Sequence, residues 1–333
     1  MTSLDEAAEL APAWDALLER SRCHRAFSSP AWFLAGCRAN PGLEPRLVAA
    51  WRGGELAGVL PLAQAPGSPE ARSPTLLGDY NDIVCLPGDS AVAAGLLAAA
   101  TAAPRPYDRI VLHLLRPDSN GLMGLAALAR EGGRGWLVGS FLCSYVRLPA
   151  AFDHYLAGRS AKFRKTLRHA EAQAARHGLE VRAIEPDERG AAELPEVFLR
   201  LHRRRFGAAS SFAAPAAERF VRAVLPRLHA RRRLLALGLF RGEELLGLDL
   251  CLRGADSLCV WNGAFDPAAA PWSPGRLLAA AGIRAALAQG CREYDLLRGD
   301  QPYKARWATH QRTLADFALL VVSRPAGGGR LAR

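Results

Sequence analysis

The sequence has few lysines and no paired cysteines, and both absences narrow what the chain can be. Only three of its 43 basic residues are lysines, namely Lys162, Lys165 and Lys304. The seven cysteines are odd in number and form no C-x-x-C motif, which argues against a disulfide framework and against a zinc site. We expect small buried thiols in a reducing cytoplasm, and no bound metal.

Long apolar runs are missing as well. The longest one, at about residues 91–103, is rich in alanine and falls short of the roughly 20 residues that a membrane-spanning helix needs. The first segment, "MTSLDEAAELAPAWDALLER", is acidic and amphipathic, whereas a signal peptide is basic and then apolar. We therefore expect a cytoplasmic protein without a membrane span.

Nucleotide-binding signatures are also absent. The sequence contains neither G-x-x-x-x-G-K-[ST] nor G-x-G-x-x-G, so a nucleoside triphosphate or a dinucleotide is not the favoured ligand. The aromatic RNP motifs and the C2H2 spacing that mark nucleic-acid readers are missing too. Nucleic acid is accordingly not expected as the main partner.

What the chain does have is an uneven distribution of charge. Residues 1–150 hold 13 Arg and 14 acidic residues, whereas residues 151–333 hold 30 basic and 18 acidic ones. The second half therefore carries all of the net charge of +11. A positive surface of this kind favours an anionic partner, such as a phosphate-bearing cofactor, an acidic carrier protein or a nucleic acid.

A short pattern also occurs twice. "WRGGELAGVLPL" begins at Trp51 and "FRGEELLGLDLC" begins at Phe240, 189 residues later. Each copy follows an apolar run, and two apolar runs around a polar R-G-x-E predict a β-hairpin with a tight turn. One such match can arise by chance. After both copies, however, a strand, an alanine-rich helix and another strand are expected in the same order.

This repeat predicts two related α/β halves in one chain. In the first half the expected elements are "NDIVCLP", "SAVAAGLLAAATAA" and "RIVLHLL". In the second they are "SLCVWNGAF", "GRLLAAAGIRAALAQG" and "REYDLL". We place the halves at residues 1–150 and 151–325, followed by a flexible tail at 326–333.

Two amphipathic helices are expected at the start of the basic half. "SAKFRKTLRHAEAQAARHG" begins at Ser160, a typical N-cap, and ends at Gly178. Its cationic face is either simply solvated or attracts a phosphate or a carrier protein. "LPEVFLRLHRRRF" at 194–206 predicts a second helix, on which His202 follows Phe198 by four residues. A structural histidine and a proton-transfer group both remain open for His202.

Two further features of the second half suggest chemistry. Asp249 interrupts the apolar strand "LLGLDLCL", where a carboxylate is costly unless it is exposed, paired or functional. Downstream, Ser273 is a candidate N-cap, Pro274 fits the first helical position, and Gly275 allows a ligand close to the backbone. A loop that leads into a helix N-terminus in this way can bind phosphate.

The succession "FRKTLRHAEAQAARHG", "HRRRF", "GEELLGLDLCL", "WNGAFDP" and "SPGRLLAAAGIRAALAQGCREYDLLRGDQPYKARW" resembles the CelD/BcsL-type branch of the GNAT acyltransferases, which carries a BioF2-like acetyltransferase domain. The resemblance covers about residues 155–310 well and the first half weakly. It implies a tandem GNAT-like fold of class α/β (α+β), with two mixed β-sheets flanked by helices and halves related by a pseudo-twofold. Fem aminoacyl transferases are similar in having two such halves.

The resemblance also implies a binding site for the donor. In GNAT enzymes the pantetheine arm of acyl-CoA pairs with a splayed central strand, and the pyrophosphate lies at the N-terminus of the following helix. The strand corresponds to 258–265 and the helix start to 273–278. The implied cofactor-binding residues are Trp261, Asn262, Gly263, Ala264, Phe265, Ser273, Pro274, Gly275, Arg276, Leu277 and Leu278. The usual loop Q/R-x-x-G-x-G/A is reduced here to the single Gly275, which leaves open whether the donor is acyl-CoA, an acyl carrier protein (acyl-ACP) or aminoacyl-tRNA.

The expected chemistry is direct transfer of an acyl group from a thioester to an amine, with no tightly bound cofactor. Asp249 or His202 is the candidate base and Tyr303 the candidate acid, because Tyr303 lies in the polar loop "RGDQPYKARW". Asp300, Lys304 and Arg306 in that loop either bind substrate or form a structural turn. The acceptor would be an amine-bearing small molecule, sugar or peptide. The alternatives are a Fem-like transferase that uses aminoacyl-tRNA, and a catalytically silent binding module.

Overall fold

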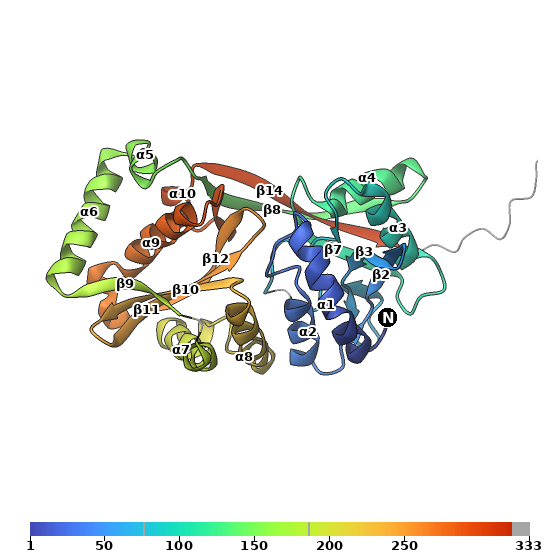
Figure 1. Cartoon of the computed structure of the whole chain (residues 1–333), viewed down its shortest axis with the longest axis horizontal. Helices are drawn as coiled ribbons and strands as arrows, with labels where there is room; N and C mark the ends of the chain where they lie inside the picture. Colours follow the sequence, from blue (N-terminus) through green and yellow to red (C-terminus); the bar gives the residue numbers. More distant parts are fainter. Residues whose placement is uncertain (76, 186, 322–333) are drawn as a thin grey trace, which may run out of the picture. The chain divides into compact units, whose positions relative to one another are not determined.

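In the computed structural model, which describes residues 1–75, 77–185 and 187–321, the chain divides into two compact units (Figure 1). Of the described residues, unit 1 comprises Met1–Cys23, Phe27–Ser140 and 314–321, and unit 2 comprises His24–Ala26 and Phe141–Thr313. The expected boundary at 150 thus lies ten residues too late, and the last strand returns to unit 1. The expected tail at 326–333 lies outside the described residues.

Unit 1 is a mixed α/β unit. Its helices are α1 (Leu4–Arg20), α2 (Pro30–Ala39), α3 (Ser90–Thr101) and α4 (Asn120–Arg130). One sheet has the strand order β1-β4-β5-β7-β14 and the other has the order β2-β3-β6. The strands are β1 (Glu44–Pro45), β2 (Val48–Arg52), β3 (Glu55–Leu60), β4 (Ala63–Gln64), β5 (Glu70–Arg72), β6 (Val84–Cys85), β7 (Arg109–Leu115) and β14 (His310–Leu320).

Unit 2 is built around one sheet with the order β8-β13-β12-β11-β10-β9. Its strands are β8 (Gly135–Arg147), β9 (Leu179–Ile184), β10 (Leu234–Arg241), β11 (Glu244–Arg253), β12 (Ser257–Phe265) and β13 (Glu293–Arg298). The helices are α5 (Phe152–Ala157), α6 (Ala161–Arg176), α7 (Glu188–Phe206), α8 (Pro215–Ala230), α9 (Pro274–Ala288) and α10 (Pro302–Trp307), with two short 3-10 helices, η1 (Gly207–Ala209) and η2 (Pro267–Trp272). Strands β8 and β14 each begin in one unit and end in the other.

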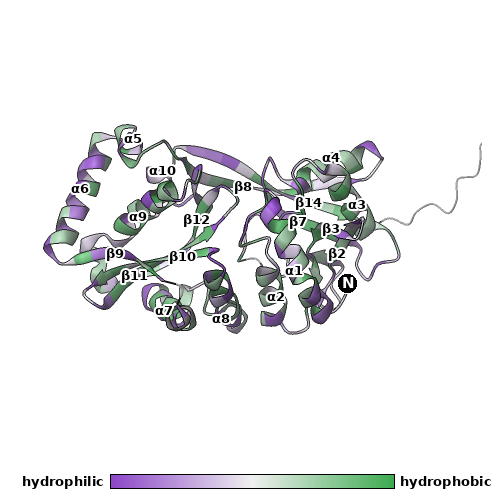
Figure 2. Ribbon diagram, viewed as in Figure 1, coloured by the Kyte–Doolittle hydropathy of each residue, from purple (hydrophilic) through white to green (hydrophobic). Residues whose placement is uncertain are grey.

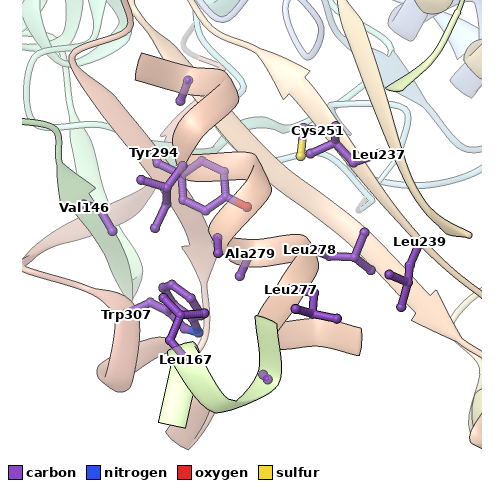
Figure 3. Close-up of a cluster of buried hydrophobic side chains, with 14 of the residues drawn as sticks. Val146, Leu167, Leu237, Leu239, Cys251, Leu277, Leu278, Ala279, Tyr294 and Trp307 are labelled. Atoms are coloured by element: carbon purple, nitrogen blue, oxygen red, sulfur yellow. The ribbon is translucent and has the colours of Figure 1, made fainter. Parts of the chain in front are cut away.

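Helices cover both faces of the sheet in unit 2. Figure 1 shows α6 and α9 on one side of β9, β10 and β11, with α7 and α8 on the other. Between the strands and α9 lies a buried cluster (Figure 3) that includes Leu237, Cys251, Leu278 and Tyr294. Hydrophilic residues follow the outer side of α6 in Figure 2, whereas Leu167, Ala170 and Ala174 face inward. The amphipathic helix expected from the sequence is confirmed, with Ser160 as its N-cap.

The repeated sequence folds into the same structure in both units. Every residue pair of the hairpin β2–β3 recurs in β10–β11 at an offset of 189, from Val48↔Leu60 and Leu237↔Asp249 to the pairs beside the turns. Even the register shift recurs, after Ala50 in one hairpin and after Leu239 in the other. The hairpins are therefore equivalent residue by residue, and Leu60 holds in unit 1 the position that Asp249 holds in unit 2.

Most elements expected after the hairpins are present. β7 and β12 have the expected bounds, whereas β6 is only two residues long and α7 begins at Glu188 instead of 194. All seven cysteines are free, and all but Cys291 are buried, as expected. Among the described residues, no helix combines the length and the apolar character that crossing a bilayer requires.

Candidate active site

Strand β12 separates from its parallel neighbour β13 in the middle of unit 2. The two strands pair only over Ser257↔Glu293, Leu258↔Tyr294 and Cys259↔Asp295. Over its later residues β12 stays paired with β11, up to Phe265↔Gly247. The edge of β12 that faced β13 is thus released from Val260 onward. This edge of β12 can pair with an extended ligand, as the strand 258–265 was expected to do.

The separation has a local cause in β13. Leu297 adopts a left-handed conformation with φ 60°, which a branched residue rarely does. Its N–H donates to the carboxylate of Asp295 over 2.8 Å, and the register against β8 shifts between Asp295 and Arg298. This bulge lies directly after the last pair with β12. It turns β13 away at the point where the two strands separate.

Asp249 lies over the released part of β12. It pairs with Gly263, and a Cβ placed on that glycine would lie 1.9 Å from Oδ1 of Asp249. The carboxylate thus covers Gly263, on the same face of the sheet as Gly247, whose neighbours include Leu278 and Pro274 of α9. Leu248 and Leu250 are fully buried and point to the opposite face. Asp249 therefore faces the α9 side of the separated strands.

The carboxylate of Asp249 is half-buried and has no hydrogen bond within the described part of the chain. Loss of solvation disfavours its charged form and raises its pKa to about 7. A carboxylic acid with such a pKa can gain and lose a proton near neutral pH, which is the property required of a general base.

Three other ionisable side chains surround Asp249, and its negative charge raises the pKa of each. Tyr303 of α10 is about half exposed, and burial together with this charge raises its pKa to about 12. Tyr294 and Cys251 are fully buried, and their pKa values are raised well above the ordinary range, mainly by loss of solvation. The hydroxyl of Tyr294, visible in Figure 3, has no hydrogen-bond partner of good geometry among the described residues. Sequence reasoning identified Asp249 and Tyr303 but missed Tyr294 and Cys251.

His202 lies on the other side of the sheet. Its ring is 4% exposed, bonds through Nδ1 to Oγ of Ser210 over 2.8 Å, and neighbours the side-chain amide of Asn262. Asn262 and Gly263 are adjacent in β12 and so point to opposite faces. Around His202 lies an aromatic cluster of Phe198, Phe206, Phe212 and Trp261. Burial lowers the pKa of His202. The structure therefore brings Asp249 and Tyr303 together and places the competing base elsewhere.

The helix expected to receive phosphate begins after a tight turn. Asp266 accepts a hydrogen bond from the N–H of Ala268 and starts η2. Ser273 then adopts a left-handed conformation with φ 55°, and Pro274 is the first residue of α9. Ser273 occupies the N-cap position but its side chain makes no capping hydrogen bond. The N–H groups of Arg276 and Leu277 donate to the carbonyl oxygen of Ser273, and Pro274 has no N–H, so the N–H of Gly275 is the group of the first turn that a ligand can reach. A Cβ on Gly275 would meet no atom within 4 Å.

Four arginines lie near the end of β12 and the start of α9. Arg204 pairs with Asp266 over 2.5 Å, and Arg205 lies 4.2 Å above the ring of Phe265. Arg241, the last residue of β10, pairs with Glu244 over 2.8 Å and lies 5.4 Å from the ring of Trp272. Arg276 belongs to the first turn of α9. This concentration of positive charge favours an anionic ligand at the helix start.

The loop after β13 is only partly available to a substrate. Asp300 and Arg306 are exposed. Lys304 is 6% exposed, and its Nζ donates to the carbonyl oxygens of Leu297, over 3.4 Å, and Arg298. The ammonium group therefore supports the bulge of β13 directly, a function that the sequence did not reveal because it depends on the left-handed Leu297.

Together, the paired α/β units and the separated parallel strands define a GNAT-like fold. Residues 161–305 match the family model described as an acetyltransferase (GNAT) domain. No curated protein matches the chain by sequence.

Solved structures confirm the fold over almost the whole chain. The structure of FemX is 13% identical and aligns with a TM-score of 0.68 over 93% of this chain and 96% of that one. L-PGS from Bacillus licheniformis is 13% identical, with a TM-score of 0.59 over 92% and 91% of the two chains. The C-terminal domain of a putative lysylphosphatidylglycerol synthetase from Agrobacterium fabrum is 12% identical, with a TM-score of 0.57 over 94% and 92%. At these identities the likeness is one of fold.

Proposed function

We propose that the chain is an N-acyltransferase that moves an acyl group from a thioester, carried by CoA or by an acyl carrier protein, to an amine acceptor. As a finer assignment we propose a CelD/BcsL-type enzyme that acts in the cytoplasm, in exopolysaccharide or natural-product biosynthesis. The observation that carries the proposal is the unpaired carboxylate of Asp249, with its raised pKa of about 7, beside the released edge of β12. The match of residues 161–305 to an acetyltransferase domain supports the same reaction class.

In the proposed reaction the donor's pantetheine arm pairs with β12 beyond Cys259, and its pyrophosphate lies at the start of α9. The neutral amine attacks the thioester carbon, a C–N bond forms, and Asp249 accepts the proton that the amine loses. The C–S bond then breaks. Tyr303, whose pKa of about 12 keeps its hydroxyl protonated, donates to the leaving sulfur. The cluster of arginines near α9 balances the charge of the phosphates.

The substitution Asp249→Asn tests the proposal because it keeps the size and polarity of the side chain but cannot accept a proton. We expect donor binding to persist while turnover with an acyl-CoA and an amine falls by about 10²- to 10⁴-fold, the range typical for loss of a general base. Intact-mass analysis of products from an acyl-CoA panel identifies the acyl group. Full activity in a folded Asp249→Asn protein would show that the amine loses its proton to water.

A Fem-like, aminoacyl-tRNA-dependent transferase is the second candidate. It is favoured by the fold likeness to FemX over 93% of the chain and by the exposed Lys162, Lys165 and Arg168 on α6. Retention of the protein on immobilised CoA or acyl carrier protein separates the two candidates, since only the thioester-dependent enzyme is retained. Turnover with any thioester excludes the third possibility, a catalytically silent binding module.

A further inference from the structure

Helix α6 carries a row of positive charges on its outer side. Its inner side, with Leu167, Ala170 and Ala174, packs into the core of unit 2. The exposed cations of the opposite side follow one another at helical spacing, and the cationic face that they form is defined by Lys162, Lys165, Arg168 and Arg176. Figure 2 shows it as the hydrophilic side of α6. Ala172 and Ala175 are exposed between the cations, and their small side chains let another surface approach closely.

The cationic face has no carboxylate to balance it. None of its cations forms an ion pair with a described residue, whereas Arg182 and Arg222 in the same unit each pair with two carboxylates. Glu171 is the only acidic residue of α6, and it pairs with Arg284 of α9 over 2.7 Å. The charge of the face is therefore available to an anionic partner.

The C-terminal end of the cationic face lies beside the start of α9. The pair of Glu171 and Arg284 joins α6 to the later part of α9. The ring of His177, which follows Arg176 at the end of α6, is 5.7 Å from the ring of Trp272 in η2. Trp272 is separated from α9 by a single residue. A partner bound on the cationic face is therefore close to the first turn of α9.

The start of α9 itself offers few groups for phosphate. The N–H of Gly275 is the one that a ligand can reach in the first turn. Of the arginines nearby, Arg204 and Arg241 already pair with carboxylates, and Arg205 and Arg276 form no ion pair with a described residue. CoA carries a pyrophosphate and a further phosphate on its ribose, whereas the phosphopantetheine arm of a carrier protein has a single phosphodiester. One N–H and two guanidinium groups match the single phosphodiester better.

We propose that the acyl donor reaches this enzyme on an acidic carrier protein, which docks on the cationic face of α6 and passes its phosphopantetheine arm to the start of α9. The inference rests on the proposed acyl transfer and names which of its two thioester donors is used. The chemistry is the same. The acyl carbon bonds to the amine nitrogen, the C–S bond breaks, and the thiol, with the proton that Tyr303 donates, stays on the carrier's arm.

A protein fits this face better than a nucleic acid does. Binding of single-stranded or splayed RNA relies on aromatic rings that stack on bases, and no Phe, Tyr or Trp is exposed among the described residues of α6. Phe163 of α6 is half-buried, and its ring centre lies 4.9 Å from that of Trp307. Lys162 and Lys165 are strongly hydrated point charges, which suit a carrier that must leave after each transfer.

Calorimetric titration of the full chain at low ionic strength tests the docking surface. The titrants are CoA and a purified acidic acyl carrier protein in its holo form, which bears the arm. We expect Lys165→Glu with Arg168→Glu to weaken carrier binding by about tenfold or more, the lower end of the range for electrostatic steering, and to leave CoA binding unchanged. Arg200→Glu with Arg227→Glu is the matched control and should bind the carrier as the wild type does. It makes the same change of charge at exposed positions of α7 and α8, across the sheet from α6 (Figure 1).

The substitution Gly275→Val tests the path of the arm. We expect it to weaken binding of the holo carrier and to leave binding of the apo carrier, which lacks the arm, unchanged, because a Cβ at Gly275 would meet only the phosphate. Equal effects on the two forms would mean that the arm does not reach α9.

Other outcomes overturn the proposal as a whole. Absence of carrier binding, or equal carrier binding by the α6 double variant and the wild type, would mean that the cationic face is only solvated. Tighter binding of tRNA than of the carrier, weakened by the same double variant, would identify RNA as the partner. Turnover of acyl-CoA tests the transferase separately. A protein that uses acyl-CoA but binds no carrier contradicts the carrier inference alone, and one that uses no thioester contradicts the proposed function.

Discussion

At the scale of single residues, the environment of Asp249 determines both its chemistry and its cost to the fold. The sequence alone identified the residue, because a carboxylate within an apolar strand needs an explanation. The sequence could not separate it from His202, because the face on which each side chain lies depends on the extra residue near Trp261, where the β11–β12 register shifts between Leu250 and Cys251. Periodicity does not predict such a bulge.

The raised pKa of Asp249 predicts a pH-dependent stability. In the folded protein the pKa is about 7, compared with an ordinary value of 3.8, so the folded state holds its proton more tightly than the unfolded state does. Stability is therefore lost as the pH rises from about 4 to about 7. Because an asparagine has no proton to lose in this range, Asp249→Asn removes this pH-dependent decrease in the free energy of unfolding. We expect it to match the wild type near pH 4 and to exceed it by about 2 kcal/mol at pH 8, after discounting for partial exposure.

Urea unfolding of both proteins at a series of pH values measures this difference. The difference in free energy of unfolding between the variant and the wild type should widen between pH 4 and pH 7 and stay constant above pH 7. A constant gap over the whole range would mean that Asp249 is solvated in the folded protein, and its assignment as a base with a raised pKa would then be wrong.

A different result is expected for His202. Its ring fills an aromatic cluster and bonds to Ser210, so His202→Ala leaves a cavity and an unsatisfied hydroxyl. We expect the free energy of unfolding to fall by about 1–3 kcal/mol, with turnover per folded molecule unchanged. Chemical denaturation and a steady-state assay measure the two effects separately. An inactive but stable His202→Ala protein, beside a fully active Asp249→Asn, would transfer the role of the base to the histidine.

At the scale of elements, the sequence predicts where helix α9 begins but not the conformation of the turn that precedes it. Pro274 and the apolar stripe of α9 were evident from the sequence, as were the bounds of β12. The left-handed conformation of Ser273 was not evident from the sequence, because a serine at that position indicates a capping side chain. The left-handed Leu297, which lies where β12 separates from β13, was not evident either, because a leucine rarely adopts that conformation. The conformation of Leu297 is accompanied by hydrogen bonds to the carboxylate of Asp295 and from the ammonium group of Lys304, side-chain contacts that the periodicity of a strand does not predict.

The start of α9 gives a test of donor binding. A Cβ at Gly275 meets no protein atom within 4 Å, so Gly275→Val should leave the fold intact and obstruct only a ligand that approaches the backbone. We expect the dissociation constant for CoA to rise by at least about tenfold, equivalent to roughly 1.4 kcal/mol. Gly95→Val is the matched control, since Gly95 lies in the corresponding helix α3 and its Cβ would also meet nothing. Unchanged CoA affinity in folded Gly275→Val would place the phosphates elsewhere.

At the scale of the whole molecule, the number of halves followed from the sequence but their boundaries did not. The repeat at an offset of 189 predicted two α/β units, and the strand register confirms it. The exchange of strands was not visible, because β8 and β14 show no break in composition where they pass from one unit to the other. Residues 141–150 were therefore assigned to the wrong half.

This boundary can be checked with fragments. Cys143–Arg147 of β8 pair with β13, so a fragment of residues 151–313 leaves one edge of β13 open and should not unfold cooperatively. A fragment of residues 141–313 retains that strand, and we expect a single cooperative transition with greater resistance to proteolysis. Equal behaviour of the two fragments would mean that β8 contributes little to unit 2.

The return of β14 to unit 1 also affects biosynthesis. Strand β7 pairs with β14 through Ala315–Leu320, and the hydrogen bond between His113 and Asp316 depends on that pairing. On the ribosome, residues 27–140 emerge before residues 141–313, yet their sheet lacks this strand until residues 315–320 have been translated. Unit 2 can form while unit 1 is still incomplete. The half that is synthesised first is thus the half that completes its folding last, which reverses the N-to-C order usual for multidomain chains.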